Sequence, residues 1–324
     1  MTDVQIWIYS GGKAQLPILA DDITWKTERT GVPGELTFTA VKEGKLSFSE
    51  GAPVHMTVDG KDVFYGYVFT KNRDKDQRIK VTAYDQLRYL KNKDTYCYEN
   101  KTATEVIREI VSSTTLRVGS LADTKYKYKH MEIGSTYFDI IQNSLDATLA
   151  FTNEMYVLYD DFGKLTLKNI KDMIVNYLVH PSTAENMDYT STIDEGVYNK
   201  IKLYEDNGED GTRNTWIAQS SSSIQQYGTL QYCEQVPDLT MIDAGTLADA
   251  LLKLYNEPKR KLTVKGVLGD VRVRAGSVVP TNLHLGDQMA TINQLMIVEN
   301  ATHKWSKGHY SMDLLLTGRG RFEG

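Results

Sequence analysis

A hairpin signal near the start of the chain sets the strongest limit on its fold. The alternating run Val54–Val58 meets a second alternating run, Val63–Val68, across the pair Asp59-Gly60. A period of two places apolar side chains on one face of a strand. Asp and Gly both tolerate the positive φ angles of a tight hairpin turn. The chain must therefore form antiparallel sheet in this region.

The rest of residues 1–90 continues this pattern. Alternating runs occur at Val4–Tyr9, Leu36–Val41 and Ile79–Tyr84. Short strands at this spacing favour a small barrel or sandwich. We therefore predict one β domain over residues 1–90.

Residues 91–188 change to a mixed pattern. Thr102 and Glu105 form a capping-box signature, and apolar residues at helical spacing follow it. A second helix of this kind begins near Thr136, and a hairpin follows around residues 160–163. The pattern predicts a small α+β domain inserted into the chain.

Strands return over residues 189–324, with one capped helix at Thr246–Tyr255. The predicted strands are Asn199–Tyr204, Thr215–Gln219, Lys261–Val264, Met296–Val298 and Tyr310–Leu316. The predicted fold class is α+β and mainly β, with two β domains on either side of the insert. No repeat is visible by identity, but the order of the domains leaves room for a diverged duplication.

Composition narrows the class of protein. The 324 residues are 41% hydrophobic and 24% charged, which is sufficient for two or three folded cores. Lys and Arg number 37 against 42 Asp and Glu, for a formal net charge of -5. This balance provides no positive electrostatic field to attract the phosphate backbone of a nucleic acid, which argues against binding of duplex DNA or RNA.

Two cysteines and the absence of leader or membrane segments indicate the compartment. Cys97 and Cys233 show no Cys-x-x-Cys spacing, and we predict free, partly buried thiols in preference to a disulfide. No basic segment followed by an apolar one opens the sequence, and no apolar run approaches the roughly 18 residues of a membrane span. We expect assembly in a reducing cytoplasm, without membrane insertion.

The sequence contains no strong metal-binding or nucleophile motif. His303 and His309 flank Trp305, which predicts a hairpin with two surface imidazoles in preference to a metal site. There is no Gly-x-Ser-x-Gly, and the serines 220–223 lack the strand-to-helix elbow that exposes a nucleophile. No helix is predicted after Gly318-Arg319-Gly320, so we expect no dinucleotide or Walker motif there. We predict no catalytic, cofactor-binding or metal site.

Adjacent acids and alternating lysines have ordinary interpretations. Asp21-Asp22, Asp160-Asp161 and Glu209-Asp210 are predicted in turns as solvated turn formers, although a glycosidase pair assembles through space and stays an alternative. Lys125–His130 alternates lysine with tyrosine. We interpret it as a solvated strand face in preference to a nucleic-acid or glycan site. The 20 tyrosines suit protein or glycan contacts.

Three stretches, taken in order, resemble one protein family. They are Val58–Val68 with Asp59, Gly60 and Gly66; Val81–Leu90; and Ser223-Ile224-Gln225-Gln226-Tyr227-Gly228. The first is similar to the first-barrel hairpin of the baseplate hub proteins of contractile phage tails, and the second to the exit from that barrel. The third is similar to the Ser-Ile-x-x-Tyr-Gly step of these hubs. The type is that of defective prophages and phage-tail-like bacteriocins, related more distantly to late-control protein D and type VI secretion spike proteins.

The resemblance also gives an interpretation of the serine-rich stretch Ser220–Gln231. It is expected to be the loop leading into a strand of a second barrel, in preference to a flexible linker or a nucleophile. Gly228 would supply backbone freedom and Tyr227 an aromatic anchor.

The resemblance implies a mechanism of assembly. Residues 1–90 and 189–324 would be tube-like β-barrels related by a pseudo-repeat, with the α+β insert 91–188 outside the ring. A homotrimer would present six similar barrels and join a hexameric tail tube, or its initiator, to a trimeric central spike. The insert would meet spike or wedge proteins, and a tape-measure protein or DNA would pass through a polar or acidic lumen. No enzyme and no cofactor is implied.

Two alternatives stay open. One is a peripheral adhesin or glycan-binding tail protein, and the other is a cell-wall hydrolase in the insert. No appended lysozyme, peptidoglycan-binding or spike domain is visible in the sequence.

Overall fold

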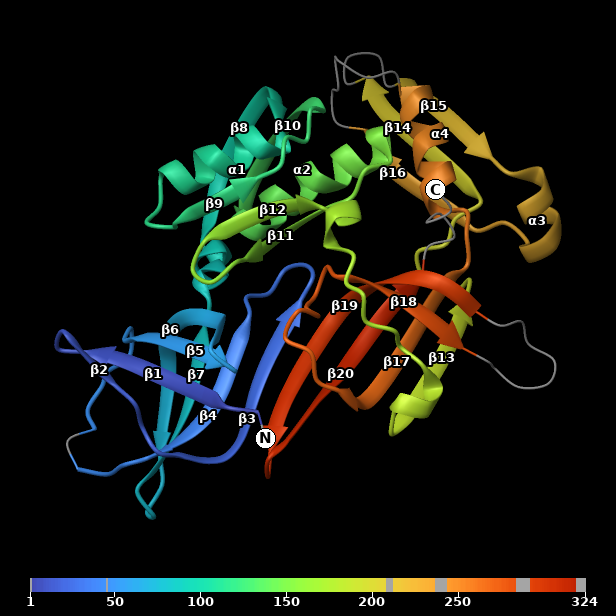
Figure 1. The fold of residues 1–324 in the computed structure, drawn as a ribbon. Helices are drawn as coiled ribbons and strands as arrows, with labels where there is room; N and C mark the ends of the chain where they lie inside the picture. Colours follow the sequence, from blue (N-terminus) through green and yellow to red (C-terminus); the bar gives the residue numbers. More distant parts are fainter. Residues whose placement is uncertain (1, 45, 208–211, 237–243, 284–291, 319–324) are drawn as a thin grey trace.

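The protein combines one large sheet with two smaller α+β units (Figure 1). A computed structural model describes residues 2–44, 46–207, 212–236, 244–283 and 292–318. The large sheet occupies the lower half of Figure 1, and the two α+β units lie above it. The prediction of a mainly β, α+β protein is confirmed.

The large sheet takes strands from both ends of the chain. They are β1 (Val4–Ser10), β2 (Lys13–Gln15), β3 (Leu19–Glu28), β4 (Glu35–Val41), β5 (Pro53–Val58), β6 (Lys61–Arg73), β7 (Arg78–Tyr84), β13 (Asn186–Thr192), β17 (Lys259–Leu268), β18 (Val278–Leu283), β19 (Ile292–Ser306) and β20 (His309–Gly318). Their order in space is β13-β17-β20-β19-β3-β4-β7-β6-β5-β1-β2, with β18 paired to β19. All of these pairs are antiparallel.

The predicted hairpin is confirmed as the β5–β6 connection. Asp59 and Gly60 have φ angles of 48° and 73°, as the tight turn requires. Val54, Met56 and Val58 alternate into the core on β5. The β6 residue Gly66 allows close packing, because a Cβ there would lie 2.3 Å from the carbonyl oxygen of Tyr84.

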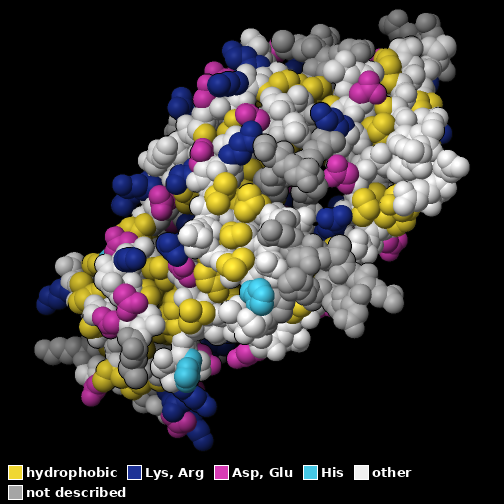
Figure 2. All heavy atoms as spheres, turned by 45° about the vertical axis from the view of Figure 1, so that its right-hand side comes forward, with side chains coloured by type: hydrophobic (Ala, Val, Ile, Leu, Met, Phe, Trp, Pro, Cys, Tyr) yellow, Lys and Arg dark blue, Asp and Glu magenta, His cyan; other side chains and the backbone are white. Residues whose placement is uncertain are grey.

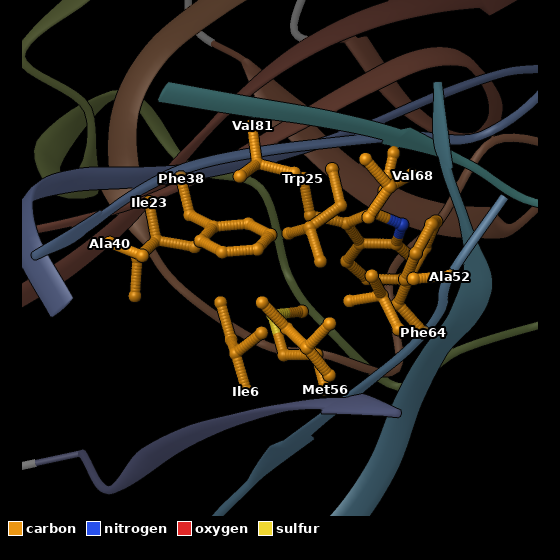
Figure 3. Close-up of a cluster of buried hydrophobic side chains, with 14 of the residues drawn as sticks. Ile6, Ile23, Trp25, Phe38, Ala40, Ala52, Met56, Phe64, Val68 and Val81 are labelled. Carbon is orange, nitrogen blue, oxygen red and sulfur yellow. The ribbon is translucent and has the colours of Figure 1, made fainter. Parts of the chain in front are cut away.

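The core of the N-terminal strands forms between the apolar faces of the bent sheet. Figure 3 shows Phe38, Met56, Phe64 and Trp25 converging from different strands. Trp305 of β19 belongs to the same cluster. The C-terminal strand β19 therefore helps to bury the N-terminal core. Such burial stabilises a fold by roughly 25 cal/mol per Å² of apolar surface.

The two β regions join edge to edge through β3 and β19. His303 pairs with Trp25, and Trp305 pairs with Ile23. The 15 residues of β19 are long enough to pair with β18 near one end and with β3 near the other. The predicted pair of separate barrels is not confirmed: strands β1–β7, β13 and β17–β20 share one open sheet that has β13 and β2 at its ends.

The first α+β unit follows β7 through a 3-10 turn, η1 (Gln86–Lys91). Its elements are β8 (Lys93–Thr102), α1 (Ala103–Ser112), β9 (Val118–Leu121), β10 (Lys127–Thr136), α2 (Tyr137–Thr152), β11 (Tyr156–Asp160), β12 (Leu165–Asn169) and η2 (Ile170–Met173). Both predicted helices begin with capping boxes, Thr102 with Glu105 and Thr136 with Asp139. The predicted hairpin is β11–β12.

The second α+β unit lies within the range predicted as one barrel with one helix. It contains β14 (Lys200–Asn207), β15 (Thr212–Gln219), α3 (Ser221–Tyr227), β16 (Gln231–Gln235) and α4 (Ala244–Tyr255). Its three strands form a sheet of their own, in the order β15-β14-β16. Two helices lie here where the sequence predicts one. The three-part division of the chain stays a prediction.

Candidate functional site: an assembly surface

The serine-rich motif folds as a helix, which corrects the predicted loop leading into a strand. Helix α3 covers Ser221–Tyr227, and the Ser220 side chain caps it by accepting from the Ser223 amide. Gly228 ends the helix with a φ of 77°. The capping serine and the terminal glycine explain the difference, because both are typical helix boundaries. The expected backbone freedom of Gly228 is confirmed.

A buried asparagine holds both ends of the α3 segment. The Asn199 amide donates to the carbonyl oxygen of Gly228 at 2.7 Å and accepts from the Leu230 amide at 2.8 Å. The Asn199 carbonyl also accepts from the Ser220 amide at 2.9 Å. Its side chain is fully buried. The segment is therefore fixed rather than a flexible linker, and no sequence pattern singled out Asn199.

The α3 segment projects from the second α+β unit at the right of Figure 1. None of the seven residues of α3 is buried. Ile224 and Tyr227 are half-buried, whereas Gln225 and Gln226 are exposed. The residues of the α3 motif therefore form a surface feature.

The two groups of motif residues lie in different parts of the fold. Asp59, Gly60 and Gly66 belong to the β5–β6 hairpin of the large sheet, while Ser223 and Tyr227 belong to α3. Figure 1 places β5 and β6 at the left and α3 at the right. The structure does not bring these residues together into one site.

His303 is not the surface imidazole that the sequence predicts. It is fully buried at the β3–β19 joint and stacks on Trp25 with ring centroids 4.7 Å apart. Its Nε2 donates to the carbonyl oxygen of Val273, and its Nδ1 accepts from the Tyr310 hydroxyl, both at 2.8 Å. Burial lowers the pKa of His303 to about 4, so the ring is neutral near pH 7. His309 is exposed, as predicted.

The predicted acid pairs differ from the expected turns. Asp21-Asp22 lies within β3, where the register with β4 shifts between Ala20 and Thr24. Glu209-Asp210 lies outside the described residues. Asp160 ends β11 and is buried, whereas Asp161 is in the turn. Asp160 is thus structural at the end of a strand and not a solvated turn former.

Asp160 lies where three parts of the chain meet. Burial raises its pKa to about 6, although its Oδ1 accepts from the Gly163 amide at 2.7 Å. Asp85 at the end of the N-terminal strands is also buried, and burial and the charge of Asp160 raise its pKa. Arg274 of the C-terminal region lies over the ring of Tyr159, 4.2 Å from its centroid. Charged side chains from the N-terminal strands, the insert and the C-terminal region, namely Asp85, Asp160 and Arg274, therefore interact with one another here.

Aromatic packing fixes the first α+β unit to the sheet. Phe162, in the β11–β12 turn, packs edge-on against His55 and Tyr65, with ring centroids 4.6 and 5.7 Å away. A Cβ at the neighbouring Gly163 would lie 2.8 Å from the Tyr65 ring. The turn therefore docks on the outer face of β5 and β6.

The cysteines and the lysine run differ in how well they match their predictions. Cys97 and Cys233 are free, as predicted, but both are exposed rather than partly buried, since each lies on the outer face of a small sheet. The lysine run lies only partly on a strand: Lys125 precedes β10 with a φ of 58°, whereas Lys127 is exposed and Tyr128 buried on β10, as the alternation predicts.

No group of three or more His, Cys, Asp or Glu among the described residues is placed to hold a metal ion. A hollow of about 520 Å³ lies between α2 and α4 and is open to solvent, with Tyr128, Tyr232 and Leu251 in its lining.

None of the helices in the described part of the chain is long and apolar enough to cross a membrane.

The chain is similar to a known protein family and to two proteins of Bacillus subtilis. A family model described as YQBQ-like matches residues 23–317. The chain belongs to the YQBQ-like family. The YqbQ protein of Bacillus subtilis is 31% identical over 231 residues, which are 69% of this chain and 70% of that protein. XkdQ of the phage-like element PBSX of B. subtilis is 27% identical over 308 residues and 92% of each chain.

Solved structures share the fold at low identity. A 43 kDa tail protein of prophage MuSo2 from Shewanella oneidensis superposes with a TM-score of 0.69 at 12% identity, over 96% of this chain and 98% of that one. A type VI secretion component from E. coli gives a TM-score of 0.56 at 8% identity, over 98% and 77% of the two chains. The chain thus shares its fold with a prophage tail protein and a type VI secretion component, which agrees with the predicted resemblance.

Proposed function

We propose that this protein is the structural hub of a contractile-tail baseplate. In this proposal three copies form a ring with pseudo-six-fold symmetry, which joins a hexameric tail tube to a trimeric central spike. The similarity to a protein of a phage-like element, and the fold shared with prophage tail proteins, support a structural role in a tail.

The observation that carries the proposal is the single open sheet built from both ends of the chain. Its two β regions meet at β3 and β19, so that one chain supplies two wall segments and three chains supply six. The sheet ends at β2 and β13, which have no further strand partner among the described residues. Such edges pair readily with another strand. The ring is proposed to close where these ends of neighbouring copies meet.

Apolar side chains beside β2 support an edge contact. Leu16 and Ile18 follow this strand and are 52% and 56% exposed. Burying one such side chain contributes about 1.5–3 kcal/mol, and about 1.4 kcal/mol corresponds to a tenfold change in association. The double variant Leu16→Lys/Ile18→Lys should therefore weaken self-association by about a hundredfold or more.

Analytical ultracentrifugation over a series of concentrations tests the proposal. The wild type should form trimers, and the double variant should shift toward monomers while keeping its circular dichroism spectrum. Met131→Lys is the matched control, because Met131 is 63% exposed but lies on β10, outside the large sheet. A wild type that stays monomeric, or equal effects of both changes, would count against the ring.

The peripheral binding protein and the cell-wall hydrolase stay as alternatives without a specific observation in their favour.

A further inference from the structure

The hollow between α2 and α4 is walled by both α+β units. The first unit supplies β10 and α2, and the second supplies β16 and α4. The volume of about 520 Å³ lies within the usual range of ligand sites, which is roughly 300–1,000 Å³. In Figure 1 both helices lie above the large sheet. The hollow is therefore a candidate contact site away from the edges of that sheet.

Apolar and aromatic side chains form most of the lining. Three leucines of α4 contribute to it, namely Leu247, Leu251 and Leu254. Phe151 of α2 stacks on Tyr126 with ring centroids 4.7 Å apart. The rings of Tyr232 and Tyr255 also lie in the wall, 5.7 Å apart, and both residues are half-buried. Because the rings pack on one another, they lose little conformational entropy when a ligand binds.

The lining carries negative charge. Its acids are Asp146 of α2 and Glu234 of β16, and both are exposed. No Lys or Arg is present among the described residues of the lining, whereas both signs of charge are interspersed on the face drawn in Figure 2. His130 also lines the hollow, but its Nε2 lies 3.3 Å from an oxygen of the buried Glu132, which balances a charge on the ring.

The lysines of the neighbouring strands and helices do not cancel this charge. Lys202 of β14 is in register with Cys233, whereas the buried Leu203 is in register with Glu234. Successive side chains of a strand point to opposite faces, so Lys202 lies on the face opposite Glu234. Three further lysines belong to β10 and α4 but do not line the hollow: Lys127, Lys129 and Lys253.

We propose that the hollow binds an arginine side chain of a partner protein together with a neighbouring apolar side chain. A guanidinium stacks on tyrosine rings and pairs with carboxylates, and the leucines of α4 would bury the apolar neighbour. Asp146 and Glu234 would repel an acidic segment. A sugar would suit the aromatic faces, but its hydroxyls would lie against the leucines without hydrogen-bond partners. The proposal concerns the α+β units and not the edges of the large sheet, so it is tested independently of the ring.

NMR titration of short peptides with the full-length chain tests this binding. The probe is the peptide Gly-Leu-Arg-Phe-Arg-Gly. The peptide Gly-Leu-Glu-Phe-Glu-Gly reverses its charge, and Gly-Ser-Arg-Ser-Arg-Gly removes its apolar side chains. Asp146→Asn and Glu234→Gln each remove one charge from the hollow with almost no change in size. Asp249→Asn is the matched control, because Asp249 is an exposed acid of α4 outside the lining.

The probe should bind, and the other two peptides should bind at least about tenfold more weakly, because each has lost either the charge or the apolar contact. Asp146→Asn and Glu234→Gln should each weaken binding of the probe about fivefold, as expected for an ion pair open to solvent, whereas Asp249→Asn should change it little. Both variants should keep the circular dichroism spectrum of the wild type.

Three results would overturn the proposal. The first is a probe that does not bind, or that binds equally well to the wild type and to both hollow variants. The second is binding of an N-acetylglucosamine oligomer in place of the probe, which would assign the hollow to a glycan. The third is binding of the probe only to the double variant Arg319→Ser/Arg321→Ser, which would assign the hollow to arginines of this chain.

Discussion

The buried imidazole of His303 makes stability depend on pH in a defined direction. Its Nε2 donates to the carbonyl oxygen of Val273, and its Nδ1 accepts from the Tyr310 hydroxyl, so the neutral ring satisfies both sides. Protonation would place a charge between Trp25 and these groups without solvent. The pKa of His303 is therefore about 4 in the folded chain, against 6.5 for an ordinary histidine.

The lowered pKa of His303 determines the direction in which folding stability changes with pH. Between pH 6.5 and 4 the unfolded chain binds a proton at His303 and the folded chain does not, so stability falls as the pH falls through this window. At about 1.4 kcal/mol per pH unit, the full loss is about 3 kcal/mol, of which about 2.5 kcal/mol has developed at pH 4.5.

Urea unfolding followed by tryptophan fluorescence measures this effect. His303→Gln removes the titrating group, so its free energy of unfolding should fall between pH 7.5 and 4.5 by about 2.5 kcal/mol less than that of the wild type. The variant itself will be less stable at pH 7.5, because it loses the stack on Trp25.

His309→Gln is the control, since His309 is an exposed imidazole on the same hairpin. It should keep the wild-type dependence on pH. If His303→Gln also kept the wild-type dependence, the reasoning about a neutral buried ring would be refuted.

Three further changes test the local structure by urea titration. Asn199→Ala should lower the free energy of unfolding by about 3 kcal/mol, because two backbone groups lose their partner; the exposed Gln219→Ala should cost little. Gly66→Ala should cost about 3 kcal/mol, because the new Cβ overlaps a backbone oxygen 2.3 Å away. Gly60→Ala, with open space around it, should cost only about 1 kcal/mol for its positive φ. Thr102→Ala should cost about 1 kcal/mol by removing the α1 cap, and an unchanged stability would contradict the capping role.

Local elements were predictable because their causes lie within a few residues. Asp59-Gly60 predicts its hairpin through positive φ angles, and Thr102 with Glu105 predicts the start of α1 through the capping box. Helix α3 had the same kind of signal, since Ser220 and Gly228 stand at helix-capping spacing. The prediction of a loop there followed from the family resemblance alone.

The environments of single residues were less predictable. Whether a histidine is exposed depends on which strand lies beside it, and the position of His303 opposite Trp25 follows from a pairing of β3 with β19 across most of the chain. Asn199 is similar, because its partners Gly228 and Leu230 lie beyond β15 and α3.

The sequence by itself therefore determined the mainly β class, the hairpin and the capped helices, since periodicity and turn chemistry are properties of the chain alone. The tertiary structure decided which strands pair. It joined β3 to β19 in one open sheet, buried His303 at the joint and brought Asp85 and Asp160 together. Alternating apolar residues fix which face of a strand is buried, but they do not choose its neighbour, because nearly any strand with the same alternation can supply the same hydrogen bonds.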